Sequence, residues 1–125
     1  RAARTIARRF DDAFRPLDLT SGQYSLLMSL NRPHPPHMQD VADLLAMDRT
    51  TLTANLKPLE RRGLVAIDID PKDKRSRLLT LTDQGMALLV KAFPIWQKTQ
   101  KDLNALVANS DSRHLLTDLI NLTNG

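Results

Sequence analysis

The sequence predicts a mainly α-helical chain with one small antiparallel β-hairpin, and three observations support this fold class. A short apolar-periodic segment beginning at Met38 is followed, after a brief turn, by a second helical segment over residues 48–63. Two apolar runs, residues 64–69 and 78–81, then flank a charged turn. Two helices in quick succession followed by a hairpin with a basic tip have the order of a winged helix-turn-helix.

The N-terminal part of the chain predicts two further helices. The first is an amphipathic helix ending near Pro16, with apolar residues at helical spacing: Ile6, Phe10, Ala13, Phe14 and Leu17. Thr20 and Gln23 have the spacing of a capping box, which opens a second helix. We expect that helix to bury Tyr24, Leu27, Met28 and Leu30. The proline-rich residues 31–36 cannot be helical and predict a connector with at most a very short strand.

Residues 48–63 have the pattern of a helix with two different faces. Asp48 is a suitable N-cap, and Gly63 ends the helix because glycine tolerates the left-handed conformation. At 100° per residue, an apolar seam of Leu52, Leu56 and Leu59 lies on one side. The opposite side carries Thr50, Thr53, Ala54, Lys57 and Arg61. Pro58 lies inside this helix and predicts a bend or a local tightening in its last turn.

A long helix is predicted from Asp83 to about Val107, followed by a final helix from Ser110 or Asp111. Apolar residues recur along the long helix with heptad-like spacing: Met86, Leu89, Phe93, Trp96, Leu103 and Val107, with Gln100 as the polar exception. Pro94 should kink it. The final helix carries Leu115, Leu116, Leu119 and Ile120. This apolar surface exceeds what one small domain covers, so we expect an obligate two-fold dimer in which the final helix packs on the partner's N-terminal helix.

Four stretches resemble the MarR family of regulators (multiple antibiotic resistance regulators). They are the helix start Asp48-Arg49-Thr50-Thr51, residues 59–65, the wing residues 73–77 and the restart at residues 81–85. The resemblance implies a single MarR-type chain over residues 1–125. Residues 19–83 would form the winged-helix DNA-binding region, and residues 1–17 and 84–125 the dimerisation helices.

The resemblance further implies double-stranded DNA as the partner, with two recognition helices in successive major grooves of a pseudo-palindromic operator. Asp73 would brace the wing by ion pairing while Arg75 enters the minor groove, and Arg77 either contacts DNA or braces the wing. The candidate DNA-binding residues are Arg49, Thr50, Thr51, Thr53, Ala54, Lys57, Arg61, Asp73, Lys74, Arg75 and Arg77.

An effector pocket is also implied, where the family's first two helices meet the long helix. Its candidate residues are Phe14, Arg15, Tyr24, Met28 and Phe93, with Arg15 as the anion anchor for a small phenolic or anionic effector. The alternative is that these side chains are core first, and that Phe93 and Trp96 fill a seam between helices.

Composition narrows the function classes. The net charge of +4 fits a nucleic-acid partner, with basic residues crowded at the N-terminus and over the helix and wing. The sequence contains no cysteine, which agrees with a reducing cytoplasm, and no signal-like or membrane-spanning run. No nucleophile–base pair or phosphate loop can be assembled, so no catalytic residues, cofactor or enzyme activity are predicted. His34, His37 and His114 are interpreted as surface residues rather than metal ligands.

The function predicted from these features is a homodimeric DNA-binding transcriptional regulator, acting as a repressor that a small molecule releases. Two alternatives remain open. One is a winged-helix module that binds a protein and never contacts DNA, which salt-insensitive behaviour on heparin would favour. The other is an effector-independent architectural DNA binder, which a ligand-dependent shift in melting temperature would argue against.

Overall fold

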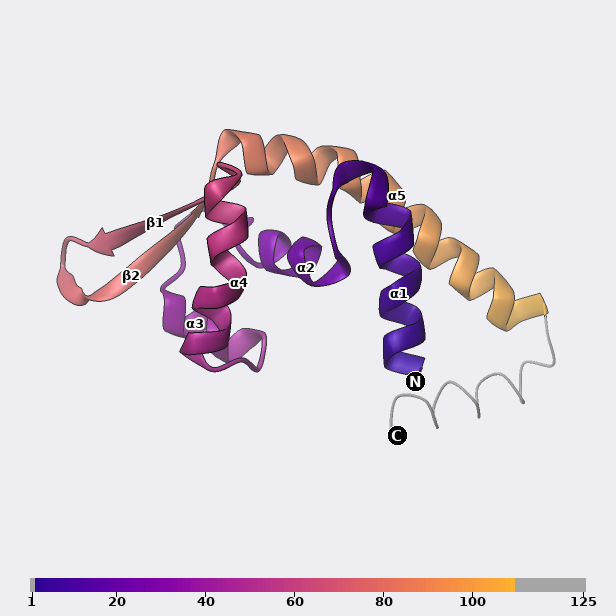
Figure 1. Ribbon diagram of the computed structural model, residues 1–125, viewed down its shortest axis with the longest axis horizontal. Helices are drawn as coiled ribbons and strands as arrows, with labels where there is room; N and C mark the ends of the chain where they lie inside the picture. Colours follow the sequence, from indigo (N-terminus) through magenta and orange to yellow (C-terminus); the bar gives the residue numbers. More distant parts are fainter. Residues whose placement is uncertain (1, 110–125) are drawn as a thin grey trace. The chain divides into compact units, whose positions relative to one another are not determined.

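The computed structural model describes residues 2–109 of the chain, and Figure 1 shows the order of their helices and strands. The elements are α1 (Ala2–Phe14), a 3-10 helix (Arg15–Leu17), α2 (Ser21–Ser29), α3 (Met38–Leu44), α4 (Arg49–Arg61), β1 (Val65–Asp70), β2 (Asp73–Leu81) and α5 (Asp83–Asn109). They form two compact units, one of residues 23–90 and one that comprises, within the described part, residues 2–22 and 91–109. The fold class is therefore mainly helical with one antiparallel hairpin, as the sequence predicts.

In the unit that contains α1, two aromatic residues of this helix are buried. Phe10 and Phe14 lie one helical turn apart, with ring centroids 6.1 Å apart, and both are buried. The helix ends at Phe14, and Pro16 lies in the 3-10 helix that follows, where its missing N–H is tolerated. Asp11 accepts a hydrogen bond from the Ser21 N–H at 2.6 Å, so α1 provides a partner for one of the N–H groups left free at the start of α2.

The helix α2 begins at Ser21, which places Thr20 at the N-cap position that the capping box predicts. Tyr24, Leu27 and Leu30 are buried as expected. The prediction was wrong for Met28, which is 38% exposed, while Leu26 is 2% exposed. The reason is the helical angle: the buried arc is centred on Leu27 and Leu30, and Met28 lies outside it.

The two helices of the helix-turn-helix end in the same way. At the end of α3, Ala46 has φ 55° and the Met47 N–H bonds to the Ala42 carbonyl at 2.9 Å. At the end of α4, Gly63 has φ 74° and the Leu64 N–H bonds to the Leu59 carbonyl at 3.0 Å. Both are Schellman-type endings, which satisfy carbonyl groups that the helix leaves free.

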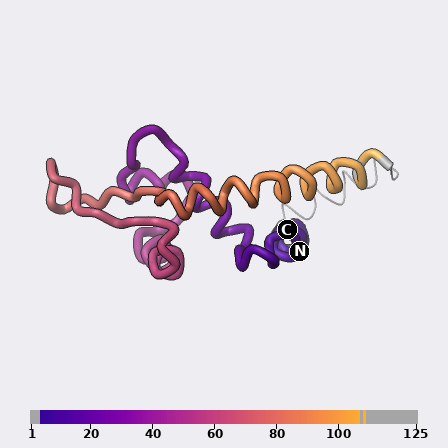
Figure 2. The backbone as a smooth tube through the Cα atoms, turned by 90° about the horizontal axis from the view of Figure 1, so that it is seen from above, coloured from indigo at the N-terminus to yellow at the C-terminus, as the bar shows by residue number. Residues whose placement is uncertain are grey.

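The wing is a two-stranded antiparallel hairpin that projects from the helices of its own unit (Figures 1 and 2). Val65 pairs with Leu81, and the ladder continues to Ile69 and Arg77 before an irregularity lets Asp70 pair with Asp73. Only residues 71–72 lie between the strands, so the longer turn expected from the sequence was wrong: Lys74 and Arg75 belong to β2. Because of this irregularity, strand pairing continues up to the two-residue turn. The run of charged residues in the sequence gave no sign that the strands extend so far.

The connector before α3 contains no strand, but an isolated β-bridge follows it at His37. His37 forms an isolated antiparallel bridge with Leu78, and the Leu79 N–H bonds to the Pro36 carbonyl at 2.9 Å. This contact gives β2 a second neighbour for part of its length. The connector is thereby attached to the wing as well as to α3.

The predicted long helix is confirmed as α5, which runs uninterrupted past Pro94. Its apolar stripe is only partly as expected, because Leu89 is buried within the chain while Met86 and Phe93 are 40% and 44% exposed. Val90, outside the predicted stripe, is 65% exposed. The predicted final helix and its leucines lie outside the described residues. Among the residues that are described, no helix is both long and apolar enough to cross a membrane.

Candidate nucleic-acid interface

The start of α4 is fixed by Asp48. Its Oδ1 accepts a hydrogen bond from the Thr51 N–H at 2.7 Å, and this backbone hydrogen bond lowers the pKa of the Asp48 carboxyl. The cap predicted from the sequence is therefore confirmed. It sets the direction in which the first turn of α4, with Arg49 and Thr50, leaves the preceding loop.

The body of α4 has one buried and one exposed face. Leu52, Leu56 and Leu59 are 0% exposed, as the sequence predicts. The opposite face presents exposed side chains of two kinds, short ones at Thr50 and Ala54 and long basic ones at Lys57 and Arg61. Short side chains allow a helix to approach base edges, and basic side chains reach phosphates.

Thr53 does not belong to the centre of that exposed face, which corrects the prediction. Its side chain is half-buried and approaches the Met38 sulfur of α3, with Oγ1 3.7 Å from Sδ. Its hydroxyl also donates to the Arg49 carbonyl one turn earlier at 2.7 Å. The physical reason is that Thr53 lies at the flank of the helix, where α3 partly covers it and the Arg49 carbonyl accepts the hydrogen bond of its hydroxyl.

The end of α4 is bonded to the base of the wing, where β1 begins and β2 ends. The Thr82 hydroxyl donates to the Gly63 carbonyl at 2.6 Å, and the Thr82 N–H donates to the Leu64 carbonyl at 3.1 Å. The same hydroxyl accepts from the Gly85 N–H at 3.0 Å. A Cβ atom at Gly85 would collide with the Leu64 carbonyl oxygen, so α5 begins in direct backbone contact with the start of β1. The motif Leu-Thr-x-x-Gly thus fixes the base of the wing relative to α4.

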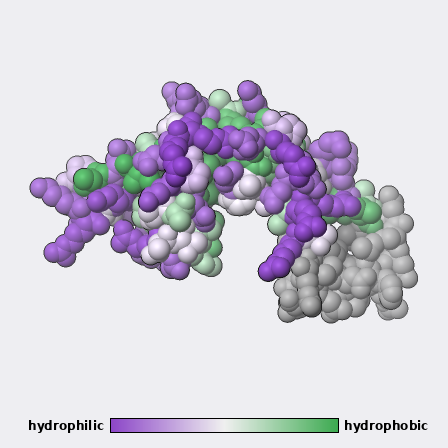
Figure 3. All heavy atoms as spheres, viewed as in Figure 1, coloured by the Kyte–Doolittle hydropathy of each residue, from purple (hydrophilic) through white to green (hydrophobic). Residues whose placement is uncertain are grey.

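Near its tip, the wing carries cationic side chains that differ in exposure and in hydrogen bonding. Lys74 and Arg75 are exposed, and Figure 3 shows hydrophilic side chains projecting from the wing. Arg77 is half-buried, and its Nη1 donates to the Lys74 carbonyl at 3.1 Å and the Ser76 carbonyl at 3.3 Å. Arg77 therefore braces the hairpin in this structure, which is one of the two roles considered for it.

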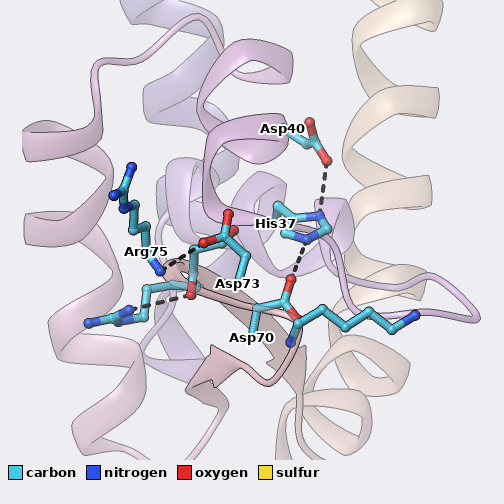
Figure 4. Close-up of polar contacts among 8 residues, drawn as sticks. His37, Asp40, Asp70, Asp73 and Arg75 are labelled. Carbon is cyan, nitrogen blue, oxygen red and sulfur yellow. Dashed lines mark hydrogen bonds and ion pairs between the residues drawn. The ribbon is translucent and has the colours of Figure 1, made fainter.

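The expected ion pair of Asp73 is not what braces the wing. Asp73 Oδ1 instead accepts the backbone N–H of Arg75 at 3.0 Å (Figure 4), and Asp73 forms no ion pair with any residue that the structure describes. A carboxylate two residues before an N–H closes a local turn, so the sequence spacing itself favours this bond. The Arg75 guanidinium is left without a carboxylate partner within residues 2–109.

One polar contact of this region was missed by sequence reasoning. His37 Nε2 lies 3.0 Å from Asp70 Oδ2, and Asp70, which the sequence places in a charged turn, is buried at 8% exposure. The hydrogen bond from the Lys72 N–H, and then that with His37, lower the pKa of Asp70. The residues are 33 positions apart, so periodicity could not reveal the contact. The only available signal was Asp70 directly before Pro71. An aspartate at such a position often accepts a hydrogen bond from the backbone N–H two residues later.

Of the remaining candidate DNA-binding residues, Arg49 and Thr51 are exposed on the first turn of α4. Arg49 extends toward α3, with Nη2 4.0 Å from the Met38 sulfur. The structure thus brings nearly all of the predicted DNA-binding residues to the exposed surface of a single unit. Within residues 2–109, no group of three or more histidine, aspartate or glutamate side chains converges as a metal site would require.

The residues predicted for an effector pocket have mixed environments. Phe14 and Tyr24 are buried, and burial raises the pKa of the Tyr24 hydroxyl. Met28 and Phe93 are exposed, and Phe93 stacks on Trp96 with centroids 6.1 Å apart. Arg15 is exposed and paired with Asp12 at 2.6 Å. These residues come from both units, and the pocket remains a prediction.

The MarR family model matches residues 19–76. The chain is 25% identical to the HTH-type transcriptional regulator SarZ of Staphylococcus aureus over 115 residues, 86% of this chain and 78% of that protein. It is similar to the M. tuberculosis transcriptional regulator MosR in complex with DNA, with TM-score 0.76 and 34% identity over 97% of this chain and 86% of that one. It is also similar to the transcriptional repressor CouR bound to a 23-mer DNA duplex, with TM-score 0.80, 28% identity and coverage of 99% and 87%.

A helix-turn-helix, a basic wing and these likenesses together define a winged-helix transcriptional regulator. The chain belongs to the MarR family, whose members are DNA-binding regulators of transcription rather than enzymes.

Proposed function

We propose that the protein is a homodimeric transcriptional repressor that binds a pseudo-palindromic DNA operator and is released by a small-molecule effector. One observation carries the proposal: the exposed face of α4, with Thr50, Lys57 and Arg61, lies opposite a leucine seam that is fully buried. A helix held by its apolar face and presenting short polar and long basic groups has the form required in a major groove.

In this proposal the residues have separate roles. Thr50 and Ala54 lie against base edges, and Lys57 and Arg61 contact phosphates, so the first pair sets sequence preference and the second supports all sequences alike. Arg49 and Thr51 add contacts at the start of α4, and the half-buried Thr53 contributes its methyl group at the flank. On the wing, Lys74 and Arg75 lie beside the backbone and minor groove, while Asp73 and Arg77 hold the hairpin in shape.

Dimer formation is supported by the exposed apolar residues of α5. Val90 is 65% exposed and Phe93 44% exposed, which is unfavourable for large apolar side chains of an isolated chain. A two-fold dimer would cover this surface and present two copies of α4 to successive major grooves. We further propose that residues 110–125 take part in this interface together with α1 of the partner.

Repression would follow from occupation of a promoter, and the relative CouR is itself named a repressor. The proposed effector is a small phenolic or anionic compound, for which Arg15 is the candidate anion anchor. It would act by favouring one of two pre-existing spacings of the reading helices. A panel of small phenolic carboxylates should raise the melting temperature of the protein and weaken its binding to DNA.

The decisive experiment begins with genome-wide binding-site selection by the full-length protein, followed by fluorescence anisotropy on the selected duplex over a range of salt concentrations. Lys57→Ala should reduce the slope of log affinity against log salt by about one. Lys98→Ala is a matched control, because it removes the same charge from the exposed Lys98–Asp102 pair on α5. Salt-insensitive behaviour and no selected duplex would favour a protein-interaction module. A folded monomer in sedimentation at micromolar concentration would contradict the dimer.

A further inference from the structure

The sulfur atom of Met38 lies where the two helices of the helix-turn-helix contact each other. Met38 is the first residue of α3, and it is buried at 5% exposure. Its Sδ faces two residues that are one turn apart on α4, at 4.0 Å from Arg49 Nη2 and 3.7 Å from Thr53 Oγ1. A buried atom of α3 thus contacts two of the side chains that the sequence predicts to bind DNA.

The two groups on α4 do not use the sulfur equally. The Thr53 hydroxyl has a single proton, which it donates to the Arg49 carbonyl over a distance of 2.7 Å between the two oxygen atoms. A carbonyl oxygen is a better acceptor than the sulfur of a thioether. The Met38 sulfur therefore remains available to the Arg49 guanidinium, which has five N–H groups and no acceptor of its own.

The Arg49 side chain has no carboxylate to hold it. Arg49 is exposed and forms no ion pair with any residue of the described part of the chain, so its hydrogen bond to Met38 is the one restraint on its guanidinium there. An arginine without a restraint samples many rotamers, and ordering it on binding costs free energy. A sulfur atom restricts the guanidinium without offsetting its charge, whereas a carboxylate would also reduce its attraction for a phosphate.

Met47, which lies between α3 and α4, provides a comparison. Its Sδ accepts a hydrogen bond from Asn55 Nδ2 of α4 at 3.6 Å. Both sulfur atoms therefore contact α4, but only that of Met38 contacts a cationic side chain. The two methionines allow the support of the helix to be separated from the orientation of an arginine.

We propose that Met38 is a positioning residue for DNA binding, whose sulfur holds the Arg49 guanidinium in one orientation before Arg49 contacts a backbone phosphate. Arg49 supplies the charge, and Met38 reduces the conformational entropy that Arg49 loses on binding. Thr53 packs against the same sulfur and fixes the Arg49 backbone through its hydroxyl. The DNA part of this inference rests on the proposed function, and the orientation of Arg49 in the free protein does not.

The test is a double-mutant cycle on the duplex that the wild-type protein selects. Met38→Leu keeps the apolar volume and removes the acceptor, an exchange that protein cores tolerate. It should weaken binding about threefold and leave the salt slope unchanged, because Arg49 still reaches its phosphate. Arg49→Ala should lower the salt slope by about one, and in its background Met38→Leu should have no further effect. Equal losses in both backgrounds would overturn the proposal.

Met47→Leu is the matched control, because it removes a sulfur that contacts α4 through Asn55 and not through a basic side chain. Its affinity for the selected duplex should stay close to that of the wild type. A loss as large as that of Met38→Leu would show that either change loosens α4 as a whole, and it would overturn the role assigned to Met38. Thermal unfolding verifies that each variant is folded at the temperature of the binding measurement.

Nuclear magnetic resonance relaxation of the free protein separates this inference from the proposed function. The Nε–H group of Arg49 should have a lower order parameter in Met38→Leu than in the wild type and in Met47→Leu. An equal order parameter in all three proteins would overturn the positioning role, whatever their affinity for DNA. A lower order parameter in Met38→Leu, without binding of any duplex by the wild type, would contradict the proposed function and leave the orientation of Arg49 by Met38 standing.

Discussion

The helix α4 and the wing lie in the same unit, yet they are held by different forces. Three leucines that are 0% exposed anchor α4, and both of its ends are closed by hydrogen bonds. The wing buries Leu79 and Val65, at 0% and 2% exposure, while Ile69 near its tip is 57% exposed. Its position depends on polar contacts at Thr82 and Asp70. Apolar burial anchors α4 along its length, whereas hydrogen bonds hold the hairpin near its tip.

This difference in the stabilising interactions predicts how α4 and the wing each respond to pH and to salt. Apolar burial is insensitive to pH and to moderate salt, so α4 should keep its shape wherever the protein is folded. Hydrogen bonds between charged groups depend on protonation and are screened, so the wing should respond to conditions that leave α4 unaffected. The positions of α4 and of the wing should therefore respond differently to pH and to salt.

The largest expected effect is on stability, in a pair of substitutions that separates the two regions. Leu56→Ala removes a side chain at the centre of the buried seam and should lower the free energy of unfolding by about 2–5 kcal/mol. Ile69→Ala truncates an exposed side chain of the wing and should cost less than about 0.5 kcal/mol. Urea denaturation of both variants measures this, and similar losses would show that the wing is anchored by apolar burial after all.

The junction between α4 and the wing should tolerate a side chain poorly. Gly63→Ala places a Cβ at φ 74°, close to Gln84 Oε1, and should cost about 1–2 kcal/mol from backbone strain. Gly22→Ala is the control, because Gly22 lies in α2 and an added Cβ would meet only Thr20 Oγ1 at an ordinary contact distance of 4.0 Å, so the change should be neutral or stabilising by about 0.5 kcal/mol. Thermal unfolding distinguishes the two, and an unchanged melting temperature for Gly63→Ala would contradict the strain.

A smaller effect is expected on DNA binding by the wing. Arg75→Ala should weaken binding by a few-fold, and more on a duplex with A·T-rich flanks than on one with G·C-rich flanks, because a narrow minor groove attracts arginine. Lys74→Ala removes a neighbouring exposed charge and should weaken both duplexes equally. Anisotropy on the two duplexes provides the comparison. Equal losses for Arg75→Ala on both would reject its minor-groove role.

The smallest effect concerns acid stability, where each region has one carboxylate with a lowered pKa. Backbone hydrogen bonds lower the pKa of Asp48 on α4 and of Asp70 on the wing. A carboxyl with a lowered pKa in the folded state stabilises the protein above its unfolded-state pKa, and this contribution is lost as the pH falls below about 4. Asp48→Asn and Asp70→Asn should each reduce the loss of stability on acidification, as measured by denaturation from pH 7 to pH 3. A wild-type dependence in both variants would show that neither carboxylate contributes.

Much of this fold follows from local sequence. The cap at Asp48, the glycine ending at Gly63 and the leucine seam of α4 each depend on residues within a few positions of one another, and helical periodicity makes them visible. The hairpin was also predictable, because two apolar runs flank a charged turn. Its tight tip was not, since the irregular pairing at Asp70 depends on how the strands align.

What only the tertiary structure decided was which side chains meet across the chain. Three examples depend on contacts between separate elements: the burial of Leu26 in place of Met28, the contact of Met38 with Thr53, and the hydrogen bond between His37 and Asp70. The sequence determined the elements and which side chains of α4 are exposed, because these depend on short-range hydrogen bonds and on the period of apolar residues. It could not determine the long-range polar contacts. A hydrogen bond requires its donor and acceptor to be placed to within a few tenths of an ångström, and only the packing of the whole chain sets that placement.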